Sequence, residues 1–384
     1  MKGAYNGTDY NVRQTRETLC CPFTVTRSPS EPSLETEPSA DARLAELTRW
    51  ITRDLGLVVT RVRPASADAS FRRYFRIERP SGSLVVMDAP PGRESLEPYI
   101  RTSAMLLDIG VNVPRVLEEN RARGFLLLTD LGSRLYLTEL EAGRNVDRLY
   151  EDALAALIRI QARGTVHAGN LPPYDRARLE QEMQLLPEWF IERHLGRGID
   201  DGLRSVLRTT FDFLLDEVLA QPRVFVHRDY HSRNLMFCEG ANPGILDFQD
   251  AVHGAVAYDL VSLLRDLYIV WPSDRVRDWV LAYRGKAVAA GVNAGASDAE
   301  FLRWFDLAGV QRHLKVLGIF ARLWHRDAKA GYLGDLPATL TYVLQASARY
   351  PELAALNDFL LREAKPSLAA ANARALQAAR TRGS

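Results

Sequence analysis

The chain has 384 residues, of which 47% are hydrophobic and 25% are charged. This length and composition are ordinary for a globular protein with a substantial core and two or three lobes. The 49 basic and 48 acidic residues nearly cancel, which argues against a general electrostatic attraction to nucleic acid or anionic membranes. Binding therefore has to be sought in local sites.

Cysteine usage and hydropathy indicate a compartment. Cys20 and Cys21 are adjacent and Cys238 lies far away, so neither a disulfide framework nor a metal-ligand spacing is present. No apolar run approaches the roughly 18 residues of a membrane helix, and residues 1–40 lack the apolar stretch of a secretory signal. We expect a cytoplasmic protein, a monomer or weak oligomer, with neither membrane nor nucleic-acid partners.

The N-terminal third changes character at residue 41. Residues 1–40 are rich in Ser, Thr, Pro and Glu without an apolar period, so we expect a disordered extension. Residues 41–130 are expected to form a small lobe, a sheet with one crossing helix. Its predicted helices cover 44–55 and 95–108, and its predicted strands cover 70–78, 84–88, 113–118 and 124–129.

Residues 131–365 are mainly helical by their apolar spacing. The predicted helices cover 146–163, 176–195, 203–219, 258–268, 273–290 and 299–324, and a closing pair of helices is expected within 340–361. Short apolar runs at 224–226, 234–237 and 244–249 interrupt them and read as strands, and residues 366–384 are expected to be a tail.

Three polar residues lie between those short strands. Asp229 precedes Asn234 by five residues, and Asp247 follows Asn234 by thirteen, across a turn rich in Gly, Asn and Pro. A hairpin of the second and third strands would bring the Asn234 amide and the Asp247 carboxylate together. Hard oxygen ligands of this kind suit Mg²⁺, which leaves its other positions to phosphate and water. Asp229, on the preceding loop, is then free to accept a proton.

The segments HRDYHSRN and ILDFQD resemble the catalytic and metal segments of the aminoglycoside phosphotransferase superfamily, whose members are protein-kinase-like. The resemblance implies an α+β, bilobal fold with an antiparallel sheet in the small N-lobe and a larger, mostly helical C-lobe. It implies ATP and Mg²⁺ as cofactors, Asp229 as catalytic base, and Asn234 and Asp247 as metal ligands.

The same resemblance assigns supporting roles. His227 and Asp259 are expected to brace the catalytic loop. Thr129 and Leu131 fall at the hinge, where backbone groups bind the adenine. His231 takes the place of a phosphate-contacting lysine of protein kinases and is a second catalytic candidate if protonated; a buried or solvent-facing role stays open.

The N-terminal lobe departs from the protein-kinase pattern. ADASFRRYFRI has no glycine where a glycine-rich loop is expected, and LVVMDAP has no lysine. We expect the Ser70 backbone and at least one of Arg72, Arg73 and Arg76 to bind the phosphates, with Arg73 and Arg76 preferred.

Six stretches in order extend the resemblance to one group within the superfamily, the bacterial N-acetylmuramate/N-acetylglucosamine anomeric kinases of cell-wall recycling. They are ADASFRRYFR, VVMDAPP, LLLTDLG, HRDYHSRNLM, ILDFQDA and QRHLKVLGIFARLWHRD. This implies phosphorylation of the anomeric hydroxyl, which Asp229 would contact. The lactyl carboxylate of muramate needs a cation, and Arg312 and Lys315 are the candidates.

Two alternatives remain at this level. An aminoglycoside kinase needs an acidic groove for a polycation, and residues 174–201 hold seven acidic residues against four arginines. A nucleotide-binding pseudokinase would explain the missing lysine, but the retention of Asp229, Asn234 and Asp247 argues against it.

Overall fold

The computed structural model describes residues 41–67 and 71–382. The predicted extension and Ser70 lie outside the described residues. The chain divides into two compact units, residues 1–48 and 49–384. Most of the described part of the first unit belongs to α1 (Ala42–Arg49), which overlaps the predicted helix 44–55.

The second unit begins with a five-stranded antiparallel sheet in the order β1-β2-β3-β5-β4. The predicted strands correspond to β2 (Arg73–Arg79), β3 (Gly82–Asp88), β4 (Val116–Asn120) and β5 (Phe125–Thr129). The edge strand β1 (Arg61–Ala67) was not predicted. Its sequence RVRPASA has little apolar alternation, and its proline is tolerated because an edge strand leaves one row of backbone groups unpaired.

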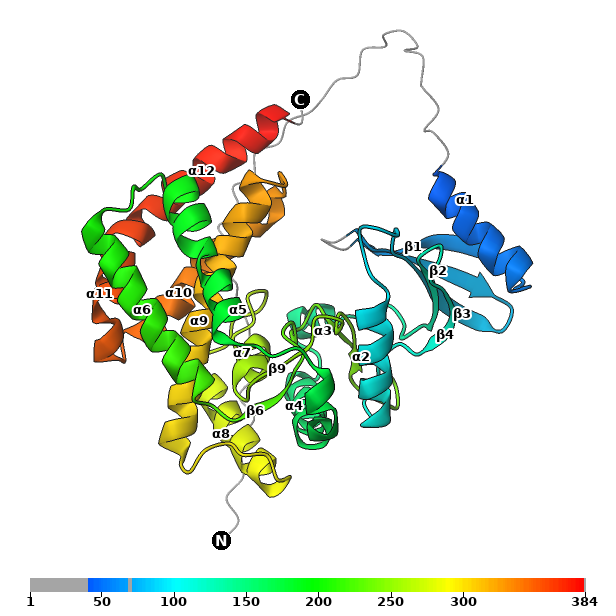
Figure 1. Cartoon of the computed structure of the whole chain (residues 1–384), viewed down its shortest axis with the longest axis horizontal. Helices are drawn as coiled ribbons and strands as arrows, with labels where there is room; N and C mark the ends of the chain where they lie inside the picture. Colours follow the sequence, from blue (N-terminus) through cyan, green and yellow to red (C-terminus); the bar gives the residue numbers. More distant parts are fainter. Residues whose placement is uncertain (1–40, 68–70, 383–384) are drawn as a thin grey trace. The chain divides into compact units, whose positions relative to one another are not determined.

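One helix packs beside this sheet. It is α2 (Glu97–Asp108), which buries Tyr99, Met105 and Leu106, and in Figure 1 it stands between the sheet and the helices α3 (Tyr136–Glu141) and α4 (Val146–Arg163). The apolar strand β5 is buried along most of its length, which matches its continuous run of apolar residues.

The remaining helices form the larger part of the unit. The predicted bounds of α4 are those observed. The predicted helix 176–195 is instead α5 (Arg176–Met183) followed by a π-helical segment, Leu186–Leu195, with Pro187 in its first turn. Further helices are α6 (Asp201–Leu219), α7 (Tyr258–Leu264), α8 (Ser273–Ala289), α9 (Asp298–His325), α10 (Leu336–Ser347) and α11 (Ala354–Phe359).

The long helix α9 is the central element of this part. It starts at Ser297, whose side chain accepts a hydrogen bond from the Glu300 N–H, and it is buried along most of its length. At Gly318 a Cβ atom would lie only 2.3 Å from the Leu185 carbonyl carbon, so only glycine permits the close approach of this neighbouring segment. Residues 366–382, expected as a tail, form most of α12 (Lys365–Arg382), an Ala-rich helix whose Asn372 bonds to His194 at 2.8 Å.

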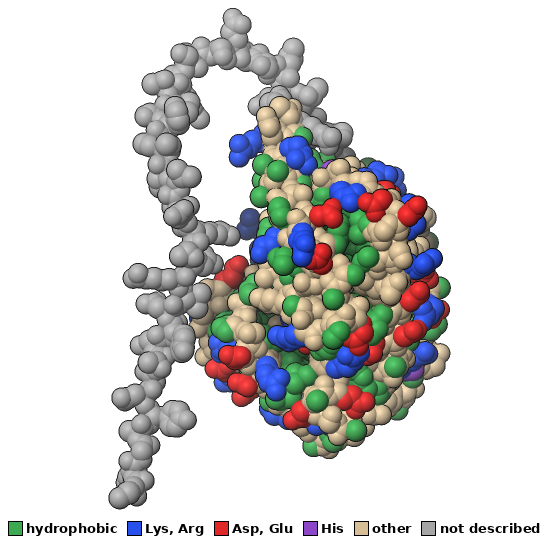
Figure 2. Space-filling model, turned by 90° about the vertical axis from the view of Figure 1, so that its left-hand side faces the viewer, with side chains coloured by type: hydrophobic (Ala, Val, Ile, Leu, Met, Phe, Trp, Pro, Cys, Tyr) green, Lys and Arg blue, Asp and Glu red, His purple; other side chains and the backbone are tan. Residues whose placement is uncertain are grey.

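The surface carries charges of both signs. On the face drawn in Figure 2, basic and acidic side chains are interspersed over the described residues. Among the helices that the structure describes, none has the length and apolar character needed to cross a membrane.

Candidate active site

Two short strand pairs frame the polar segment. β6 (Arg223–Val226) pairs with β9 (Val252–Ala255), and β7 (Leu235–Met236) pairs with β8 (Gly244–Ile245), so the predicted hairpin is present. The Asn234 amide nitrogen donates to the Asp229 carbonyl at 2.9 Å and to the Asp247 carboxylate at 3.4 Å. The hairpin therefore brings Asp229, Asn234 and Asp247 into one cluster.

The donor set of this cluster fits Mg²⁺. The amide nitrogen of Asn234 is directed at protein oxygens, so its amide oxygen is the atom of this side chain that could coordinate a cation. Gln249 donates to the other Asp247 oxygen at 2.7 Å, which orients the carboxylate. Nowhere in residues 41–67 and 71–382 do three or more His, Cys, Asp or Glu side chains gather as a metal site. A hard cation that takes its other ligands from phosphate and water matches these oxygens.

Asp259 holds the loop that carries Asp229. Its carboxylate, at the start of α7, accepts hydrogen bonds from the backbone N–H groups of His227 at 2.6 Å and Arg228 at 2.9 Å. Burial raises the pKa of Asp259 to about 7, an effect that these two N–H groups oppose. Both carboxylate oxygens of Asp259 thus accept a hydrogen bond from the backbone of the loop.

His227 fixes the loop from the other side. Its Nε2 donates to the Leu246 carbonyl at 2.9 Å, so its Nδ1 can accept the Asp229 N–H at 3.3 Å. Burial lowers the pKa of His227 to about 4, which keeps the ring neutral at neutral pH. This geometry is that of a bracing residue, the role predicted for His227.

The electrostatic environment keeps Asp229 ionised. Burial alone would raise the pKa of Asp229, but the charges of Lys315, Arg312 and Arg228 hold it below its usual range. Burial lowers the pKa of His231, whose ring packs edge-on against Tyr268 at 5.4 Å. A neutral His231 does not supply the charge of a kinase lysine, so the structure does not favour its predicted role as a protonated donor.

A small pocket opens beside Asp229, with a volume of about 100 Å³. We call it the Asp229 pocket. It combines a polar edge with an apolar wall, and its lining residues are Asp229, His231, Tyr258, Asp266, Leu267, Tyr268, Arg312, Lys315, Val316, Ile319 and Phe320. The structure thus brings the predicted substrate-binding residues Arg312 and Lys315 next to the predicted base.

These two cations differ in their partners. The Lys315 ammonium lies 3.0 Å from a Glu182 carboxylate oxygen and 3.3 Å from the Tyr258 hydroxyl. Arg312 is only 4% exposed, and its Nη1 has no hydrogen-bond partner in the part of the chain that the structure describes. Arg312 is therefore the cation with capacity left for an anionic group in the Asp229 pocket.

Glu182 on α5 was not predicted. Its carboxylate joins Lys315 to Arg228, whose Nη2 lies 2.5 Å away. Arg228 stands next to the base with φ of 78°, a region that costs a non-glycine residue energy, and Glu182 holds its side chain in place. In the sequence Glu182 was one acidic residue among seven, and no local signal marked it.

We expect Glu182→Ala to lower the free energy of unfolding by about 3 kcal/mol at pH 7, because it leaves two buried cations unpaired. Burial alone would raise the pKa of Glu182, but Lys315 and Arg228 lower it overall. Its contribution is therefore present above the ordinary glutamate pKa and lost as the pH falls through the lowered value. Denaturant unfolding at several pH values tests this, with exposed Glu180→Ala on the same helix as control. Equal stability of both variants at pH 7 would contradict it.

The predicted nucleotide-binding residues lie on the sheet and its exit. Arg73 pairs with Asp88 at 2.5 Å, and Arg76 pairs with Asp130 at 2.6 Å. Both arginines are paired with carboxylates in this structure. Their contact with phosphate stays a prediction.

The hinge residues also have partners. The Thr129 N–H donates to the Arg115 carbonyl at 3.0 Å, and the Leu131 carbonyl accepts from the Cys238 thiol at 3.4 Å. The adenine-binding role of Thr129 and Leu131 likewise remains a prediction.

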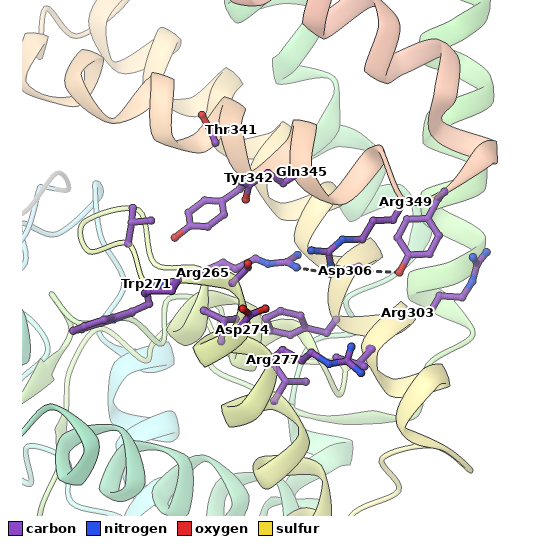
Figure 3. Close-up of a pocket in the computed structure, with 18 of the residues that line it drawn as sticks. Arg265, Trp271, Asp274, Arg277, Arg303, Asp306, Thr341, Tyr342, Gln345 and Arg349 are labelled. Atoms are coloured by element: carbon purple, nitrogen blue, oxygen red, sulfur yellow. Dashed lines mark hydrogen bonds and ion pairs between the residues drawn. The ribbon is translucent and has the colours of Figure 1, made fainter. Parts of the chain in front are cut away.

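A much larger cavity, of about 950 Å³, lies among the helices (Figure 3). Its centre is the Asp306 carboxylate, which is bound by Arg265, by Arg349 at 3.0 Å and by the Tyr350 hydroxyl at 2.9 Å. The catalytic cluster does not line this cavity. We therefore place the chemistry at the smaller Asp229 pocket, because size alone does not supply a base or metal ligands.

Comparison with known proteins identifies the family of the chain. Residues 61–305 match the family model described as "Phosphotransferase enzyme family". Two curated relatives are named N-acetylmuramate/N-acetylglucosamine kinase. The one from Pseudomonas aeruginosa is 47% identical over 332 residues, or 84% of this chain and 97% of the relative. The one from Pseudomonas putida is 44% identical over 333 residues, with the same coverage.

Solved structures show the same fold at low identity. A choline kinase from Streptococcus pneumoniae is 12% identical, with a TM-score of 0.56 over 80% of this chain and 100% of that one. An ADP-bound aminoglycoside phosphotransferase is 15% identical, with a TM-score of 0.53 over 79% and 97% of the two chains. The expectation of a bilobal, kinase-like α+β fold is confirmed. The chain belongs to the phosphotransferase enzyme family.

Proposed function

We propose that the chain transfers the terminal phosphate of ATP to the anomeric hydroxyl of N-acetylmuramate and N-acetylglucosamine, giving the sugar 1-phosphates used in peptidoglycan recycling. The observation that carries this proposal is the Asp229 pocket, where a base, a buried arginine and an apolar wall meet. The names of the relatives at 44% and 47% identity support the same substrates. Because the reaction consumes ATP, we place it in the cytoplasm.

The pocket suits the acceptor in chemical terms. An amino sugar has hydroxyl groups around its ring and an apolar face, which Tyr268 and Phe320 can cover. Arg312 has an Nη1 donor available for the lactyl carboxylate of muramate, whereas Lys315 is held by Glu182. We assign carboxylate recognition to Arg312 and give Lys315 the task of shaping the pocket and lowering the pKa of Asp229.

Asp229 is the base of the proposed reaction. Its carboxylate orients the anomeric hydroxyl toward the terminal phosphate and receives the hydroxyl proton as the new P–O bond forms and the bond to ADP breaks. A hemiacetal hydroxyl is more acidic than an ordinary alcohol, so a carboxylate of low pKa is an adequate acceptor. Asn234 and Asp247 would hold Mg²⁺, which supplies charge neutralisation at the phosphates when bound.

The roles of the two lobes follow from the assignment of the base and the metal ligands. We propose that residues 41–130 cover the nucleotide and that residues 131–365 carry the base, the metal ligands and the sugar pocket. The acidic segment 174–201 does not favour a polycationic antibiotic, since Glu182 is paired with Lys315, Glu188 with Arg193, and Asp200 with Arg197.

Phosphorus NMR of the products tests the proposal. The protein is incubated with ATP, Mg²⁺ and each sugar, and Asp229→Asn protein serves as the control for contaminating kinases. We expect the 1-phosphate from both sugars. A 6-phosphate, or turnover of kanamycin with no product from either sugar, would contradict it.

Arg312→Ala tests the assignment of the carboxylate. Only muramate carries the lactyl group, so kcat/KM should fall by at least about tenfold more for N-acetylmuramate than for N-acetylglucosamine, as expected for the loss of a charged hydrogen bond. Arg326→Ala, at the exposed end of α9, is the control and should leave the ratio unchanged. An equal loss of kcat/KM for both sugars would show that Arg312 does not bind the lactyl group.

A further inference from the structure

The sheet lacks the lysine that protein kinases use to hold ATP phosphates. In those enzymes a lysine of the third strand pairs with a glutamate of the neighbouring helix. Here β3 carries Val85 opposite Arg76 and Met87 opposite Tyr74, so apolar side chains occupy the face that these β2 residues share. A cation for the phosphates has to come from another position.

Three of the arginines that lie in β2 or directly before it are held in different ways. Arg73 and Arg76 are bound to Asp88 and Asp130, both within or directly after strands of the sheet. Arg72 instead pairs with Glu94 at 2.9 Å, and the two side chains are only 10% and 17% exposed. Glu94 lies three residues before the start of α2, so this ion pair links the sheet to the helix beside it.

The same helix reaches the candidate metal ligand. Tyr99 of α2 packs its ring on Phe248 with centroids 4.8 Å apart, and Phe248 directly follows Asp247. Burial raises the pKa of Tyr99 well above its usual value; of the charges near it, Arg72 lowers this pKa and Asp247 raises it. The turn before α2 thus binds Arg72 through Glu94, and α2 itself packs through Tyr99 on the residue next to Asp247.

We propose that Arg72, positioned by Glu94, is the cation of the N-terminal sheet that binds the nucleotide phosphates. A guanidinium presents five N–H donors in a planar fork, so it can keep one carboxylate and still offer an edge to phosphate. The Arg72 and Glu94 pair thereby does the work of the lysine and glutamate pair of protein kinases, with the cation moved from the third strand to the start of the second. This inference rests on the proposed use of ATP but not on the identity of the sugar.

Calorimetry with adenosine, ADP and ATP tests the proposal on the full chain. Arg72→Ala should weaken ATP and ADP binding by at least tenfold and leave adenosine binding unchanged, because adenosine has no phosphate. Arg72→Lys should restore part of the lost affinity.

Steady-state kinetics tests the positioning role of Glu94. Glu94→Gln should raise the KM for ATP less than Arg72→Ala does, with the KM for sugar unchanged. Arg63→Ala, which removes an exposed ion pair of the same sheet, is the matched control.

The outcomes separate the two proposals. If Arg72→Ala binds ATP as the unaltered protein does, or loses adenosine and ATP equally, the assignment of Arg72 is wrong. Melting curves of each variant show whether the fold is kept, and Arg72→Lys provides a second test if the alanine variant unfolds. A failure of the sugar assignment would appear only in the NMR products and would leave the difference between adenosine and ATP intact.

Discussion

We expect Asp229→Asn to reduce the turnover number by at least about 100-fold and to leave the affinity for ATP nearly unchanged. The amide keeps the shape of the side chain but cannot take the hydroxyl proton, and general-base catalysis contributes roughly 100- to 10,000-fold. Steady-state rates at saturating sugar measure the first effect, and calorimetry with ATP measures the second. Asp278→Asn, an exposed change on α8, is the control for the loss of one carboxylate.

The same residue predicts a pH dependence. The base must be ionised, and the cations around it keep the pKa of Asp229 below its usual range. In the pH profile of kcat/KM, the fall on the acid side that belongs to Asp229 should therefore occur at a pH below the ordinary pKa of aspartate. Activity should be lost as the pH falls through that lowered pKa. Loss of ATP binding in Asp229→Asn, in parallel with turnover, would instead place this residue in the metal or nucleotide site.

We expect Asp247→Ala to weaken ATP binding in the presence of Mg²⁺ by at least about tenfold, since it removes the carboxylate of the proposed metal site. It lowers turnover as well, because the charge of the transferring phosphate is no longer neutralised. Calorimetry with Mg²⁺ and with EDTA separates the two contributions: the variant and the unaltered protein should differ in Mg²⁺ and agree in EDTA.

The control for Asp247 is Asp250→Ala, three residues further along and exposed. It should bind ATP and Mg²⁺ as the unaltered protein does. An Asp247→Ala protein whose ATP affinity still rises on addition of Mg²⁺ to the full extent would show that other residues hold the metal.

That Asp229, Asn234 and Asp247 lie together was predictable because their geometry is local. Asn234 and Asp247 are separated by 13 residues, and the turn between them carries the glycines, asparagine and proline that close a hairpin. Asn234 and Asp229 are separated by five residues, within one loop. Helices with a sustained apolar period were predicted for the same reason, and the predicted bounds of α4 are those observed.

Elements with weak local patterns were missed. The strand β9 is only four residues long, and β1 combines arginines with a proline. The π-helical segment after α5 keeps a helical pattern of apolar residues, so periodicity alone could not divide the predicted helix 176–195. In each case packing against neighbouring elements decided the backbone conformation.

The sequence by itself determined the class of fold, the grouping of Asp229, Asn234 and Asp247 in one loop and hairpin, and the absence of the third-strand lysine, since each rests on residue types at short, regular spacing. Only the tertiary structure decided which charges meet. The contact of His227 with Asp259 spans 32 residues, and the contact of Lys315 with Tyr174 spans 141. The pairing of Arg72 with Glu94 likewise depends on how the sheet lies against the turn before α2. Such contacts are set by the packing of whole elements, which spacing along the chain does not encode.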